Sequence, residues 1–133
     1  AGEGIDIPTD PLAKYAPPHA DATLTISPNP SPPGEVTQFW TITETDSVGF
    51  TVESIILESF DPGGSRIDST AMNQQEIIDI TGDDSAYFPP RFSFTGTRTT
   101  TITLTSQSWI LVSVLATDDN NVPFSFSDKV TIQ

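Results

Sequence analysis

The side chains best suited to chemistry in this sequence are four oxygen donors in one predicted turn: Asp118, Asp119, Asn120 and Asn121. Calcium takes about six to eight oxygens from carboxylates, amides and carbonyls, so this cluster predicts a calcium site. Asp83 and Asp84 form a second acidic pair, expected at the same end of the fold. The alternative is structural, because Asp and Asn also form turns through hydrogen bonds to their own backbone.

No other kind of chemistry has comparable support in the sequence. A hydrolase needs a nucleophile, a base and an orienting group. The single histidine, His19, lies in a Pro-rich stretch, and there is no Cys. Neither G-x-S-x-G nor H-E-x-x-H occurs, and no Gly-rich phosphate loop or cofactor motif does. We therefore expect a protein that is not an enzyme and that needs no cofactor, with calcium as the one candidate metal ion.

The charge and the hydropathy exclude two classes of partner. The chain has 18 acidic and 5 basic residues, a net charge of −13. Such a chain repels phosphate backbones and anionic lipid surfaces, so we expect no nucleic acid binding. No apolar run reaches the ~20 residues of a membrane span, so we expect no membrane insertion. Zero Cys also rules out disulfides and thiolate metal sites.

The pattern of the chain is that of an all-β domain. Ser and Thr make up about a quarter of its 133 residues, and Thr suits a pleated surface. The segment Ser65–Gln75 is polar and predicts a loop or an edge strand, and a bulge is expected near Glu53 and Ser54, where the apolar phase changes. Period-two alternation and turn residues predict strands over Ala22–Ser27, Glu35–Thr45, Phe50–Phe60, Glu76–Ile80, Arg91–Thr95 and Thr99–Thr105, and a hairpin over Trp109–Ile132.

Two features of these strands bear on the core. Trp40 lies mid-strand beside Ile42, which favours a core position. The first strand of the hairpin, from Trp109, is apolar on both faces, which favours cover on both sides. Seven to nine strands at this spacing predict an antiparallel β-sandwich over residues 22–133.

Residues 1–21 form an arm of different composition. Pro8, Pro11, Pro17 and Pro18 exclude a regular helix or a central strand. We expect an extended segment that packs on the domain or on another molecule, as added strands do at sheet edges. The side chains able to bury area there, and so predicted to bind a partner, are Ile5, Ile7, Leu12 and Tyr15.

Two stretches resemble bacterial extracellular immunoglobulin-like domains. Thr23–Gly64 is similar to their first three strands, with a Pro-rich corner and an Asp-Pro-Gly-Gly turn. Val114–Ile132 is similar to the last hairpin of PKD-like domains, with Asn121 where Gly is usual. The resemblance covers about 110 residues and implies an immunoglobulin-like fold, but it is nearly silent on function.

The sequence thus predicts a secreted, non-catalytic sandwich that acts through protein contacts. The chain starts with Ala1 and Gly2, a small-residue start typical of signal-peptide cleavage, so we expect an extracellular, cell-surface or periplasmic location. The preferred role is a structural or adhesive subunit of a surface assembly, such as a filament, with other copies or another surface protein as partner. The alternative is a carbohydrate- or ligand-binding module using Tyr87, Phe88 or Trp109.

Overall fold

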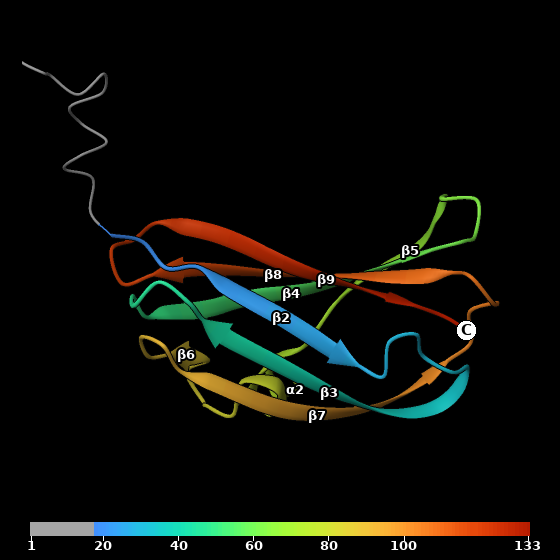
Figure 1. The fold of residues 1–133 in the computed structure, drawn as a ribbon, viewed down its shortest axis with the longest axis horizontal. Helices are drawn as coiled ribbons and strands as arrows, with labels where there is room; N and C mark the ends of the chain where they lie inside the picture. Colours follow the sequence, from blue (N-terminus) through green and yellow to red (C-terminus); the bar gives the residue numbers. More distant parts are fainter. Residues whose placement is uncertain (1–17) are drawn as a thin grey trace, which may run out of the picture.

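The structure, a computed structural model, describes residues 18–133 as a two-layer sandwich (Figure 1). Its elements in chain order are β2 (Ala22–Ser27), β3 (Gly34–Glu44), β4 (Phe50–Phe60), β5 (Arg66–Ala71), α2 (Gln74–Thr81), β6 (Tyr87–Phe88), β7 (Ser93–Ile102), β8 (Trp109–Asp118) and β9 (Pro123–Thr131).

Two antiparallel sheets make the layers. One has the order β2-β3-β7; the other has the order β5-β4-β8-β9, with the short β6 also paired to β4. Eight strands in two facing sheets confirm the predicted all-β sandwich. The alternation in the sequence explains the layers, because every second residue of β2 and of β3 is buried and the residues between are mostly exposed.

The inner faces of both sheets meet in one apolar core. Trp40 and Ile42 of β3 are fully buried, which confirms the predicted core position of Trp40. On the opposite sheet, the rings of Phe50 and Phe88 stack with centroids 5.1 Å apart. The predicted bulge is also confirmed, since the pairing of β4 with β8 shifts register between Val52 and Ser54.

One predicted strand is wrong, because Glu76–Ile80 lies within helix α2. The helix begins with a capping box: Asn73 accepts the N–H of Glu76, and the Glu76 side chain accepts the N–H of Asn73. Gly82 ends it in the left-handed conformation, at φ 72°. These local signals outweigh the β-propensity of the three isoleucines, of which Ile80 is fully buried.

A second difference concerns strand β7. Arg91–Thr95 and Thr99–Thr105 were expected as separate strands, but Ser93–Ile102 is one continuous strand, β7. Gly96 does not break it. It pairs with Trp40 of β3 and leaves room for helix α2, since a Cβ at this position would lie 2.6 Å from the carbonyl oxygen of Asp79.

Gly96→Ala should therefore destabilise the protein. The added methyl group forces helix α2 away from β7, and overpacking of this kind costs about 1–3 kcal/mol. Urea unfolding measures the change. Gly63→Ala is the matched control, because a Cβ there meets nothing closer than 3.4 Å and its unfolding midpoint should stay near that of the unaltered protein. Equal stability of the two variants would contradict the close packing of α2 on β7.

Candidate functional site

The predicted calcium ligand Asp118 is a buried hydrogen-bond acceptor, only 4% exposed. Its Oδ2 accepts the N–H of Ala20 at 3.0 Å. Its Oδ1 accepts the N–H groups of Asn120 at 2.8 Å and Val122 at 2.9 Å. Burial acts to raise the pKa of Asp118, but the three backbone bonds outweigh it and hold the pKa below its ordinary value. The carboxylate thus attaches residue 20 to the β8–β9 turn.

The other three predicted ligands also serve the turn. Asp119 accepts a hydrogen bond from the hydroxyl of Tyr87 at 2.8 Å. The Asn120 amide donates to the carbonyl of Pro18, and Asn121 adopts the left-handed conformation, at φ 63°. Within residues 18–133, no three His, Asp or Glu side chains gather closely enough to hold a metal ion. The calcium site stays a prediction.

The calcium hypothesis has a direct test. An ion bound only by the folded state raises the stability, and with it the melting temperature, more and more as its concentration exceeds its dissociation constant. If Asp118 and Asp119 bind calcium, millimolar calcium should raise the melting temperature above that in chelator, and Asp119→Asn should remove the rise. Equal melting temperatures in calcium and in chelator would leave the turn with its structural role alone.

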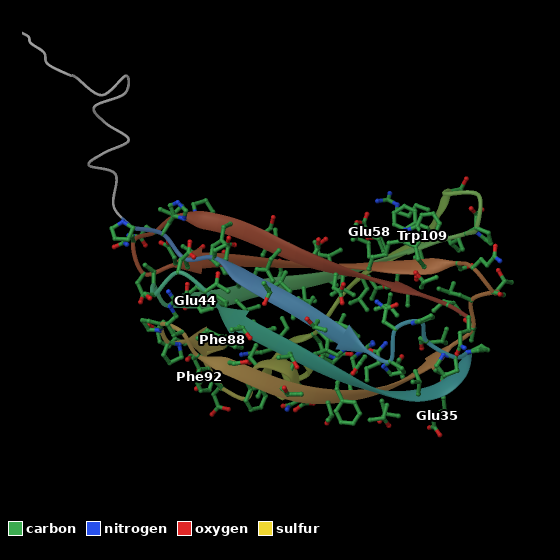
Figure 2. The ribbon with its side chains drawn as sticks, viewed as in Figure 1. Glu35, Glu44, Glu58, Phe88, Phe92 and Trp109 are labelled. Carbon is green, nitrogen blue, oxygen red and sulfur yellow. The ribbon has the colours of Figure 1, made fainter. Side chains whose placement is uncertain are left out.

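Glu44 is the second buried carboxylate, at the same end of the sandwich (Figure 2). Oε2 accepts the N–H groups of Asp21 and Asp46, at 3.3 and 2.7 Å. Oε1 accepts those of Ser47 and Arg91, at 2.7 and 2.9 Å. Burial acts to raise the pKa of Glu44, yet the four bonds hold it below the ordinary value. The charge is used to join three separate segments, and it is not free for acid–base chemistry.

Glu44→Gln should lower stability at neutral pH by about 1–3 kcal/mol, because the amide can accept at one position only and leaves buried N–H groups unsatisfied. The lowered pKa also fixes the sign of the pH dependence. The stabilisation is present above the ordinary glutamate pKa and is lost as the pH falls through the lowered one. Unfolding in denaturant across acidic pH should therefore show a smaller acid loss in the variant. Glu35→Gln, at an exposed position, is the control.

The aromatic residues considered for sugar binding are mostly covered. Phe88 is fully buried. The Trp109 indole stacks on Phe60 with centroids 5.4 Å apart, and Lys129 Nζ lies 4.5 Å from the ring centroid. Because β8 lies between β4 and β9, these two neighbours approach the indole from opposite sides. Figure 2 shows Trp109 beside the β4–β5 hairpin, where a Cβ at Gly64 would lie 3.8 Å from the indole.

The outer face of β8 is less covered than its composition indicates. Trp109 and Leu111 are partly buried there, but Leu115 is 38% exposed. Within residues 18–133, no element packs over this face, so the expected cover on both sides of β8 is found on the inner side only.

One side of the sandwich, between β2 and β9, is closed by hydrogen bonds. Asp128 Oδ2 accepts the N–H of Ile26 at 2.9 Å. The Asn29 amide donates to the carbonyl of Lys129 at 2.8 Å and its oxygen accepts the N–H of Thr131 at 3.1 Å. Each bond runs from the β2 side of one sheet to β9 of the other, so the two sheets are tied along this side.

The opposite side, between β5 and β7, is only half closed. Helix α2 covers the part around Gly96. Beyond the helix lies a groove of about 350 Å³. Its lining is mixed. Arg98 and Glu76 both line it and pair at 3.6 Å. The other polar side chains along it are Ser59, Asp68, Thr70, Thr100, Thr101 and Thr103. The apolar side chains along it are Leu57, Ile67, Met72, Ile102, Leu104 and Ile110.

Strand β5 borders this groove and offers a free edge. It pairs with β4 on one side, and no other strand of residues 18–133 pairs with its second side. All six of its residues are exposed, and Ile67 reaches 56%. An unpaired row of N–H and C=O groups is a template for another strand. A free edge beside a groove with apolar side chains along it is the geometry into which an extended peptide can add.

Sequence reasoning did not single out this groove. The predicted partner-binding residues, Ile5, Ile7, Leu12 and Tyr15, lie outside the described residues, so their contacts stay a prediction. The only local signal was Ile67, an isolated apolar residue in the polar stretch after Gly64. The rest of the groove comes mainly from four other elements, β4, α2, β7 and β8, which only the fold brings together.

Comparisons with known proteins support the fold and leave the family open. No protein-family model matches the sequence, and no curated protein does. A protein named as ApaA from Bordetella pertussis has a similar structure, with a TM-score of 0.54 and 12% identity over 86% of this chain and 96% of that chain. A CARDB domain from Pyrococcus furiosus gives a TM-score of 0.41 and 11% identity over 86% and 90%. Identities this low support the fold alone, and the similarity to the Bordetella protein supports a β-sandwich.

Two further expectations stand apart from the fold. The PKD-like part of the resemblance is matched by no family model and stays a prediction. No helix in the described part of the chain is long and apolar enough to cross a membrane.

Proposed function

We propose that this protein is a non-catalytic β-sandwich that acts through protein–protein contacts, as a structural or adhesive subunit of an extracellular assembly. The observation that carries the proposal is the open side of the sandwich between β5 and β7. There a groove lined by both apolar and polar side chains lies beside a strand edge without a partner in residues 18–133. Monomeric proteins cover such edges, and assembling proteins use them.

The buried carboxylates support a structural role over catalysis. Glu44 and Asp118 both have lowered pKa values, and all their bonds go to backbone N–H groups. A general acid or base needs a pKa near the working pH and access to a substrate. These two groups have neither. They stabilise the end of the sandwich at which the chain enters the domain.

The alternative function, a carbohydrate- or ligand-binding module, rests on weaker support. An aromatic platform needs an open ring face, and the Trp109 ring lies between Phe60 and Lys129. Tyr87 is partly exposed, but its hydroxyl is bonded to Asp119. Glycan binding that is lost in Tyr87→Ala, with folding preserved, would favour this alternative.

The proposed assembly predicts that the full chain associates and that the association depends on the N-terminal segment. Removal of residues 1–17 keeps Ala20 and Asp21, which bond to Asp118 and Glu44, so the shortened chain should fold. Light scattering over a concentration series should show complexes for the full chain and monomers for the shortened one. Added salt should strengthen the association, because copies of net charge −13 repel one another.

Circular dichroism and the melting temperature provide the control for folding of the shortened chain. Identical masses of the full and the shortened chain over the whole concentration and salt range would contradict this role for the segment.

A further inference from the structure

We propose that the groove between β5 and β7 receives the N-terminal segment of a second copy of this chain, with residues 3–7 added as a strand along the free edge of β5. This inference rests on the proposed function and names the contact through which copies associate. It follows from the shape of the groove, from the pattern of the segment and from the positions of both in the fold.

The groove needs an extended occupant with apolar side chains on one face. Its walls are Ile67, Asp68 and Thr70 on β5 and Ile102 on β7, and the apolar Leu57 and Ile110 lie between the sheets. A strand paired with β5 points alternate side chains toward this lining and the others toward solvent. A volume of about 350 Å³ suits a few side chains and not a folded domain.

The first residues of the chain have this pattern. In Glu3-Gly4-Ile5-Asp6-Ile7, the two isoleucines alternate with Gly4 and Asp6. With Ile5 and Ile7 in the groove, Asp6 points outward, on the face of β5 that carries Arg66. Pro8 follows at once and limits the added strand to its N-terminal side, because proline cannot continue the pairing.

The positions of the two parts favour a second copy. The segment joins the domain beside the β8–β9 turn, where Asp118 binds Ala20. The groove reaches Ile110, near the other end of β8 and roughly 27 Å away for eight residues of strand. Figure 1 shows the start of β2 and the β4–β5 hairpin at opposite ends of the sandwich. Copies in a row thus bring the segment of one to the groove of the next.

Such a contact joins two different surfaces, so it does not close on itself. A heterologous contact repeats along a line and yields an open filament unless a rotation closes a ring. The segment could also bend back onto its own domain, because 17 extended residues span up to ~56 Å. The experiment below separates these two arrangements.

The test uses two full-length variants with opposite defects. Ile5→Asp with Ile7→Asp removes the inserted side chains and keeps the groove. Ile67→Asp replaces an apolar side chain of the groove with a second carboxylate beside Asp68, and it keeps the segment. Each variant alone should stay monomeric by light scattering, while the mixture should give a one-to-one complex of twice the mass, with no larger species. The intact segment of the Ile67 variant then occupies the intact groove of the other.

Matched controls isolate the groove from general changes of the surface. Phe39→Asp alters a side chain of similar exposure, 49% against 56% for Ile67, on the outer face of the other sheet, and should assemble as the unaltered chain does. Thr9→Asp adds a charge to the segment outside the proposed strand and should also assemble. Melting temperatures of all variants confirm their folding.

The outcomes separate this inference from the proposed function. Assembly of either defective variant by itself, or a mixture without a complex, would overturn the inference while the unaltered chain still assembles. A monomeric mixture would assign the segment to its own domain or to another site. An unaltered chain that stays monomeric at every concentration and salt level would overturn the proposed self-assembly itself.

Discussion

The apolar layer between the two sheets has to be covered along both of its sides, and the rest of the structure depends on how this is done. Along β2 and β9, polar side chains cover the apolar layer, because Asp128 and Asn29 form hydrogen bonds with backbone groups of the facing sheet. Along β5 and β7, helix α2 covers one half and leaves the groove in the other. The molecule therefore has one closed and one open side, and the association we propose would use the open one.

The acidic composition has two separate origins. Glu44 and Asp118 are buried, ionised and bonded to backbone N–H groups, so they belong to the architecture. Both lie at the end where residues 20 and 21 enter the domain, and they hold the start of β2 against the β3–β4 and β8–β9 turns. Most of the other acidic residues in the described part of the chain are exposed, and their charge favours repulsion between identical copies. Any contact between copies must overcome this repulsion locally.

The sequence predicted the elements that depend on alternation, and it missed those that depend on context. Strand β2 and the bulge in β4 follow from side-chain periodicity alone. Helix α2 was missed because Ile77, Ile78 and Ile80 favour a strand, although Asn73 and Glu76 carried the capping signal. The calcium prediction relied on residue types, which cannot show that Asp118 already accepts three backbone bonds. The groove could not be predicted, since its walls come from segments up to about fifty residues apart.

The energies of the proposed contact explain why it would work in an assembly and not as a tight pair. Burial of two isoleucines contributes roughly 3–6 kcal/mol. Each added backbone hydrogen bond contributes a net ~0.5–1.5 kcal/mol. Association costs about 4–15 kcal/mol in lost freedom, before the repulsion between acidic copies. A single contact is then weak. Each subunit added to a line gains one such contact, so the length of the proposed assembly would depend on the subunit concentration and on the ionic strength.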